Sequence, residues 1–199
     1  MSEKLRDFIF KMWIVISVVL VFTVVVFILG YIFKNGFNSL NMEFIFDDPK
    51  GMPIGSEGGV FPAIVGSLLL MLIACVFASI LAISTSIYTV FYCKSKNLES
   101  IIHLIIQCMA GIPSIVLGLF GYTLLVLYLN LGRSLLSAGI TLGIMIFPYI
   151  EVRVEKTLRE VNKFVIDSSY ALGVSTAYMI FKLILPICKT DIISAIILA

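Results

Sequence analysis

The chain has 199 residues, of which 60% are hydrophobic and 13% are charged, and its formal net charge is +2. Soluble domains are typically ~45–50% apolar and ~25% charged, so this composition excludes an ordinary soluble domain and predicts a polytopic membrane protein. The small net charge gives no basis for nucleic-acid binding, and the basic residues gather near the ends of apolar segments, where they carry information on topology.

The first apolar segment, Met12 to Phe33, is long enough to cross a hydrocarbon core of ~30 Å as a helix. It is too long for the core of a signal peptide and has no small-x-small cleavage site, so we expect it to remain as an anchor. Lys4, Arg6 and Lys11 precede it, and the positive-inside rule therefore predicts a cytoplasmic N-terminus. Residues 34–60 are rich in Gly, Pro, Asn and Asp, which predicts an outer loop dominated by turns.

Two further spans are predicted in the middle of the chain, from Phe61 to Tyr92 and from Ile101 to Leu129. The sequence GIPS at residues 111–114 interrupts the second of these, because proline removes a helix hydrogen bond and clashes with the preceding turn. Broken backbone in lipid must be covered by protein or line a cavity, so we expect the break to be buried in the bundle. Its candidate residues for a translocation pathway are Gly111, Pro113 and Ser114.

The fourth predicted span, Ser134 to Ile150, contains Gly139 and Gly143 in a small-xxx-small pattern that permits close helix contact. From Glu151 the chain becomes charged but keeps a helical period, so we expect the helix to continue out of the membrane. The continuation has one apolar face and two pairs of opposite charges four residues apart. These residues are Val154, Leu158, Val161 and Val165, with the pairs Glu155/Arg159 and Lys156/Glu160.

Charged residues near the span ends are the remaining candidates for a site. Glu151 and Arg153 are candidates for the translocation pathway, since ionisable groups there are costly and an arginine fork suits an oxyanion. The alternative is that Arg153 only anchors the inner interface. His103 is more typical of a hydrogen-bonded interfacial residue than of a ligand. We expect no catalytic triad or paired carboxylates within the bilayer and no metal site, and we interpret the cysteines as small core residues: Cys75, Cys93, Cys108 and Cys188.

Residues 167–186, DSSYALGVSTAYMIFKLILP, form a polar insert before a fifth apolar segment, Leu183 to Ala199. Basic residues surround the insert, which predicts that it is cytoplasmic. Gly173 can take the left-handed conformation that ends one helix, and Ser175 or Thr176 can cap the next. The pattern predicts a helical hairpin, with an ordinary connecting loop as the alternative. Its helices are expected at Phe164 to Leu172 and at Ser175 to Leu183.

The insert resembles the cytoplasmic EAA loop of bacterial ABC importer permeases, whose pattern is Glu-Ala-Ala, three residues, Gly, nine residues, then Ile-x-Leu-Pro. Gly173, Leu185 and Pro186 match at this spacing. Leu183 replaces the Ile, and the positions of Glu-Ala-Ala are held by Asp167, Ser168 and Ser169.

Two other stretches resemble the Pst-type phosphate permeases, and their PstA side in particular. They are EGGVFPAIVGSLLL at residues 57–70 and AGIPSIVLGLFGY at residues 110–122. In these permeases an arginine comes shortly after the proline that matches Pro148. Val152 stands at that position here, and Arg153 comes one residue later, about 100° around a helix. The family normally continues beyond the point where this chain stops, so we expect at least one further helix after the fifth span.

The resemblance implies an all-α polytopic transmembrane helix bundle of the ABC importer permease type, with about five spans visible. Residues 1–60 would form an N-terminal tail, anchor and outer loop, and residues 61–199 a permease core with its coupling loop at 151–182. The implied substrate is phosphate, with phosphonate, molybdate or sulfate as alternatives, and the implied location is a bacterial or archaeal cell membrane.

The implied partners are a second permease subunit of the PstC kind, two ATPase subunits and an extracellular binding protein. The sequence has no GxxxxGK[ST], so ATP hydrolysis would belong to the ATPase, and this chain would carry no cofactor and no catalytic residue. An intramembrane enzyme and a structural or sensory protein are the alternatives from other classes. The residues implied to contact the ATPase are Asp167, Ser168, Ser169, Tyr170, Ala171, Gly173, Leu185 and Pro186.

Overall fold

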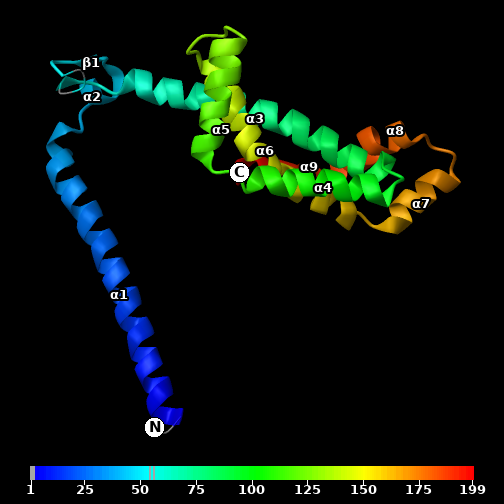
Figure 1. The fold of residues 1–199 in the computed structure, drawn as a ribbon, viewed down its shortest axis with the longest axis horizontal. Helices are drawn as coiled ribbons and strands as arrows, with labels where there is room; N and C mark the ends of the chain where they lie inside the picture. Colours follow the sequence, from blue (N-terminus) through cyan, green and yellow to red (C-terminus); the bar gives the residue numbers. More distant parts are fainter. Residues whose placement is uncertain (1–2, 54, 56) are drawn as a thin grey trace. The chain divides into compact units, whose positions relative to one another are not determined.

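The computed structural model describes residues 3–53, 55 and 57–199, without the side chains of residues 3–5 and 38. The described chain is almost entirely helical and forms two compact units, residues 1–64 and 65–199 (Figure 1). The predicted all-α class is confirmed. Three of the described helices are long and apolar enough to cross a membrane, and a bent helix pair would make a fourth.

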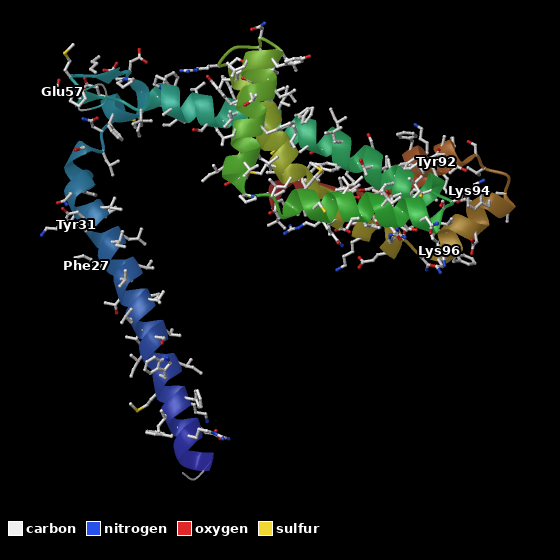
Figure 2. All side chains as sticks on the ribbon, in the orientation of Figure 1. Phe27, Tyr31, Glu57, Tyr92, Lys94 and Lys96 are labelled. Carbon is white, nitrogen blue, oxygen red and sulfur yellow. The ribbon has the colours of Figure 1, made fainter. Side chains whose placement is uncertain are left out.

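The first unit begins with α1, Glu3–Gly36, a single helix of 34 residues that contains the predicted anchor. Its apolar side chains are exposed along the whole helix, and Figure 2 shows them standing out from it around the labelled Phe27 and Tyr31. A helix in lipid satisfies its backbone internally and presents apolar side chains to the acyl chains, so this exposure fits a membrane anchor.

The outer loop is more ordered than its turn-rich composition predicted. It contains a 3-10 turn at Phe37–Ser39, the short helix α2 at Met42–Phe46, and the antiparallel strands β1, Pro49–Lys50, and β2, Glu57–Gly58. The side chain of Asn41 accepts a hydrogen bond from the Phe44 amide and begins α2. Close by, the Lys50 ammonium donates a hydrogen bond to Asp47 and lowers the pKa of that carboxyl.

The second predicted span is confirmed as α3, Phe61–Ile87, which continues as a π-helical turn to Tyr92. Small residues at every fourth position of α3 are buried: Ala74, Ala78, Ala82 and Ser86. They let α3 approach α6, Leu135–Glu160, closely. A Cβ atom on Gly143 of α6 would lie 2.7 Å from the Phe77 ring and 3.0 Å from the Ala74 carbonyl oxygen. The predicted close packing at Gly139 and Gly143 is therefore confirmed.

The predicted break in the third span is also confirmed. α4, Lys96–Ala110, ends just before it, and α5, Ser114–Gly121, begins after it and continues as a π-helical turn to Tyr128. The two helices are bent by 97°. However, all four residues of the break are exposed, so the expected burial is wrong for this chain. The bend turns α5 away from α4 and leaves the break on the surface of the second unit.

α6 is longer than the predicted fourth span. It begins at a capping box made by Ser134 and Ser137, and it runs without interruption through Pro148 to Glu160. The helix ends there because the Val161 backbone is extended, with ψ at 132°. The expectation that Val161 and Val165 continue the same helix is therefore wrong. Asn162 accepts a hydrogen bond from the Phe164 amide and begins the next helix, α7, Lys163–Ala171.

The last part of the chain is one helical run from Thr176 to Ile197. It consists of α8, Thr176–Met179, a π-helical turn at Ile180–Ile184, and α9, Leu185–Ile197. The predicted boundary at Leu183 is therefore wrong. Pro186 lacks an N–H, and the wider turn before it accommodates the missing hydrogen bond without ending the helix. That this run crosses a membrane stays a prediction.

The core of the second unit lies where α6 meets α9. Ile150, Val154 and Leu158 project from α6. The helical run from Thr176 to Ile197 contributes Met179, Ile184, Cys188 and Ile192. α3 and α4 add Ala78, Ala82 and Ile106. The segment that follows Gly173 is therefore continuous with the helix that forms the core.

Candidate functional site

The predicted helical hairpin is present between α7 and α8. Gly173 has φ at +71°, the left-handed conformation that was expected. The Gly173 amide donates to the Tyr170 carbonyl at 3.0 Å, and the Val174 amide donates to the Ser169 carbonyl at 3.1 Å. These two bonds form a Schellman motif, which satisfies the last carbonyls of α7. The Ser175 side chain then accepts from the Tyr178 amide and begins α8, so the hairpin is held by backbone and cap bonds at its turn.

The tip of the hairpin presents apolar side chains on its surface. Leu172 is 82% exposed and Tyr170 is 48% exposed, and Phe164 of the same helix is also exposed. Asp167, Ala171 and Gly173 are exposed as well, while Ser168 and Ser169 are half-buried. Exposed apolar side chains on a rigid turn are typical of a surface that another protein covers.

Leu185 and Pro186 lie away from the tip. Leu185 is half-buried against the core, and Pro186 is exposed in the first turn of α9. Together with the π-helical turn before them, they mark where the hairpin joins the packed helix.

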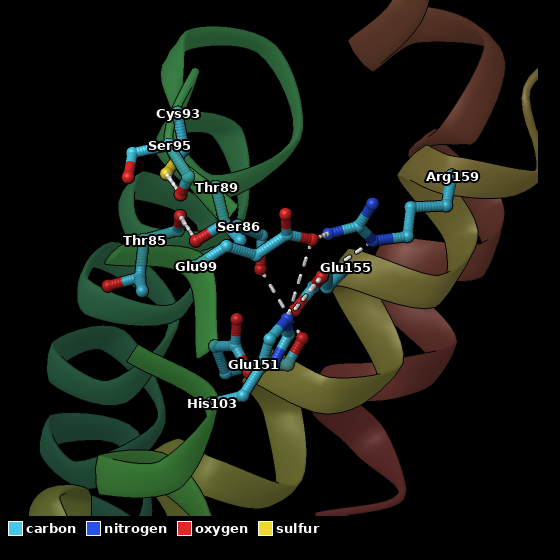
Figure 3. Close-up of polar contacts among 10 residues, drawn as sticks. All are labelled: Thr85, Ser86, Thr89, Cys93, Ser95, Glu99, His103, Glu151, Glu155 and Arg159. Atoms are coloured by element: carbon cyan, nitrogen blue, oxygen red, sulfur yellow. Dashed lines mark hydrogen bonds and ion pairs between the residues drawn. The ribbon is translucent and has the colours of Figure 1, made fainter. Parts of the chain in front are cut away.

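A cluster of charged side chains lies between α4 and α6 (Figure 3). Arg159 donates from Nε to Glu155 at 2.6 Å and from Nη2 to Glu99. His103 Nε2 lies 3.4 Å from Glu155 Oε1 and 3.9 Å from Glu99 Oε1. The predicted pair Glu155/Arg159 is confirmed and is one part of this cluster, and the predicted pair Lys156/Glu160 is also present, at 3.8 Å.

Glu151 adjoins this cluster one turn earlier on α6. Its residue is fully buried, and its carboxyl lies beside that of Glu155. Ser86 of α3 donates to the backbone carbonyl of Glu151 at 3.3 Å. Within the part of the chain that the structure describes, neither carboxylate oxygen of Glu151 receives a hydrogen bond. Two ionised carboxylates offer each other no donor, so this buried pair requires a proton or another cation.

The structure therefore brings together paired carboxylates that were not predicted from the sequence, and the expectation that none lies within the bilayer stays a prediction. Glu151 and Glu155 are adjacent on the buried face of α6, and α4 brings Glu99 and His103 to them from about fifty residues away in the sequence. Arg153, by contrast, is exposed, so the structure does not bring it together with Glu151.

A hollow of about 750 Å³ lies between α5 and the first half of α6. Its walls are mostly apolar and include Ser114, Gly121 and Thr141. At its rim the Arg133 guanidinium lies over the Tyr122 ring, 5.9 Å from the ring centre. Of the three residues predicted at the break, Ser114 lines this hollow.

The family model for binding-protein-dependent transport system inner membrane components matches residues 92–199, which include the break, the charged cluster and the hairpin. The chain belongs to this family. The family match thus covers the helices from α4 to α9, and the resemblance seen in the sequence is confirmed.

Three relatives of this permease show the likeness more closely. This chain is 30% identical over 145 residues to the phosphate transport system permease protein PstA 2 of Mycobacterium tuberculosis. The match covers 73% of this chain and 48% of the relative. The chain is 32% identical over 143 residues to a probable PstA of Methanocaldococcus jannaschii, covering 72% and 50%. The probable ABC transporter permease YqgI of Bacillus subtilis is 24% identical over the whole chain, which covers 67% of it. The chain spans about half the length of the first two.

A solved structure shares the fold. The permease matches a chain of the MetNI methionine ABC transporter in inward-facing conformations with a TM-score of 0.60 and 19% identity, covering 68% of this chain and 65% of that one. About two thirds of this chain thus shares its fold with a chain of that transporter.

Sequence reasoning missed two features of this site. The Leu172 side chain is more exposed than the apolar side chains predicted for the hairpin tip. Its position next to Gly173 is the sequence signal that could have identified it. The cluster at Glu99, His103 and Glu155 had a weaker signal. Glu99 and His103 are four residues apart, but Glu99 precedes the span predicted from Ile101, and nothing local to the sequence places the two residues against α6.

Proposed function

We propose that this permease forms half of the translocation pathway of an ABC importer for inorganic phosphate and is driven by a separate ATPase. The observation that carries the proposal is the rigid hairpin at Gly173 with its exposed apolar tip, at the spacing of the coupling loop in ABC permeases. The names of the PstA relatives support phosphate as the transported anion.

The hairpin is built to transmit a displacement. Its tip is held by the Schellman motif and by the Ser175 cap, and α8 continues without a break into α9. Met179, Ile180 and Ile184 in this run are fully buried. When the ATPase subunits close, they move the tip, and the run carries the movement to the packed helices, which shift between inward- and outward-open states.

The remaining parts of the importer belong to other chains. We propose a second permease subunit of the PstC kind, two ATPase subunits that hydrolyse ATP, and an extracellular protein that delivers the anion. The exposed break at residues 111–114 supports the second permease, because broken backbone in lipid needs a protein cover. The setting is a bacterial or archaeal cell membrane, with the N-terminus and the hairpin in the cytoplasm.

Uptake of labelled phosphate tests this function. Cells that lack this permease and any redundant phosphate system are expected to lose uptake at low external phosphate and to regain it when the chain is returned with its partners. Competition with unlabelled phosphonate, molybdate and sulfate separates phosphate from the alternative anions. Undiminished phosphate uptake in the deleted strain would overturn the phosphate assignment.

Association with the ATPase is measured independently. The permease solubilised in detergent is expected to copurify with an ATPase subunit, and replacement of the exposed Leu172 at the tip is expected to weaken that association. An ATPase that copurifies equally well with the tip variant would contradict docking through the hairpin.

A further inference from the structure

We propose that Glu99, His103 and Glu155 bind one divalent transition-metal ion, such as zinc, which joins α4 to α6. The three side chains each offer a ligand atom, and these atoms all lie within 4.8 Å of one another. His103 Nε2 lies 3.4 Å from Glu155 Oε1 and 3.9 Å from Glu99 Oε1. Neighbouring ligand atoms around a tetrahedral zinc are about 3.3 Å apart, since the metal–ligand bonds are ~2.0–2.1 Å. The three donors are therefore close to the spacing that the ion requires.

Glu151 supplies an independent reason for a cation at this place. Its carboxyl is fully buried and directed at that of Glu155, and no residue that the structure describes donates to it. When ionised, Glu99, Glu151 and Glu155 carry three negative charges, which Arg159 offsets by one. A divalent cation would compensate this imbalance, and a proton shared by Glu151 and Glu155 is the competing explanation that the test below separates.

Arg159 fits the role of an outer partner to the ligands. It donates to Glu155 Oε1 and to Glu99 Oε1, the same two oxygens that lie near His103 Nε2. Each carboxylate has about four acceptor positions, so both can bond Arg159 and the metal together. Such outer hydrogen bonds orient metal ligands and hold them in place.

The ion can reach the cluster from a hollow of about 370 Å³. His103, Glu155 and Arg159 are on its walls, and Glu99 and His103 are partly exposed. Imidazole together with carboxylates suits zinc and its first-row neighbours, and zinc is among the more tightly held of these ions. The site is therefore both reachable and chemically matched to zinc.

His103 is the one histidine of the sequence, which gives the test a direct probe. The chain, labelled with ¹⁵N-histidine and purified in detergent, is first treated with N-ethylmaleimide, so that its cysteines do not bind zinc. Titration with zinc chloride is expected to show one bound ion per chain by equilibrium dialysis. The imidazole resonance is expected to move in step with that binding, and the melting temperature to rise by several degrees.

Matched variants separate this site from adventitious binding. Glu99→Gln and His103→Gln are each expected to weaken zinc binding at least tenfold. Both positions are partly exposed, so the variants are expected to fold, which far-UV circular dichroism checks. Glu160→Gln serves as the control, because Glu160 lines the same hollow but pairs with Lys156, and it is expected to keep the affinity.

Three results would overturn the proposal. One is an imidazole resonance that zinc does not move while pH does, which would mean that protons balance the cluster. Another is unchanged zinc affinity in the folded Glu99→Gln and His103→Gln variants. The third is a loss of affinity in Glu160→Gln as large as in Glu99→Gln.

Discussion

The hairpin around Gly173 and the packed face of α6 each depend on a glycine, but for opposite physical reasons. At Gly173 a Cβ atom would meet no described atom within 4 Å, and the constraint is the left-handed backbone, with φ at +71°. At Gly143 the backbone is ordinary helix, and the constraint is space, because α3 lies against it. The hairpin is therefore shaped by its own chain, and the α6 face by its neighbours.

The polar groups of the two regions differ in the same way. The hairpin satisfies the ends of its helices locally, through the bonds made by Gly173, Val174 and Ser175. On the α6 face, Glu155 finds its partners on α4 and at Arg159, and Glu151 has no donor within the described chain. Local bonding satisfies the hairpin while its apolar side chains stay exposed, whereas the α6 face contains a buried carboxyl without a described hydrogen-bond partner.

The largest expected effect comes from filling the space at Gly143. Gly143→Leu forces α3 and α6 apart, because its Cβ alone would lie 3.0 Å from the Ala74 carbonyl oxygen. Overpacking of this kind costs about 3 kcal/mol. We expect a clear fall in the melting temperature in detergent. Gly118→Leu is the control, since no described atom lies within 4 Å of its Cβ position, and equal losses in the two variants would contradict the packing explanation.

Replacement of Gly173 is expected to reduce stability less, but to reduce ATPase copurification and transport specifically. Gly173→Val places a branched residue at positive φ, which costs about 1–2 kcal/mol and distorts the hairpin tip. ATPase copurification and transport are expected to fall. Gly132→Val is the matched control, with φ at +68° and open space around it, but outside the hairpin. Gly173→Asn is expected to keep ATPase copurification and transport, because Asn tolerates this conformation. If Gly132→Val reduced ATPase copurification as much as Gly173→Val, the loss would not be caused by distortion of the hairpin.

The sequence predicted the hairpin well because its determinants are local. Gly173 and Ser175 take the roles that their residue types favour, and the break at residues 111–114 follows directly from Pro113. Where prediction failed, tertiary packing decided the outcome. The run from Thr176 to Ile197 stays helical through Pro186 because a π-helical turn absorbs the missing bond, which composition does not reveal.

The charged cluster shows the same limit for the site. Glu155 and Arg159 are four residues apart, so their pairing was predicted, but Glu99 lies sixty residues before Arg159. Only the packing of α4 on α6 brings Glu99 and His103 to this pair. Burial of Glu151 was equally hidden, since the sequence predicted that the helix continues beyond Ile150 but not that α3 packs against it there.

A modest gain in stability is expected when an amide replaces the buried carboxyl of Glu151. Glu151→Gln supplies an amide that can donate to Glu155 and removes one buried negative charge. Such a hydrogen bond contributes about 1 kcal/mol. The melting temperature, measured with a chelator present, is expected to rise by a few degrees. Glu160→Gln changes an exposed pair and is expected to alter stability little. A lower melting temperature for Glu151→Gln would show that the carboxylate has a stabilising partner.

The smallest effect on stability, and the clearest division between the two regions, is expected at Leu172. Its side chain is 82% exposed, so Leu172→Ser removes almost no buried surface and is expected to change the free energy of unfolding by less than about 0.5 kcal/mol. The same change removes the most exposed apolar side chain of the hairpin tip and is expected to weaken copurification with the ATPase. Leu198→Ser is the control, because Leu198 is 68% exposed at the end of α9, outside the hairpin. A variant that binds the ATPase normally would show that the tip is not the contact surface, whereas a variant that unfolds would show that Leu172 packs within the permease.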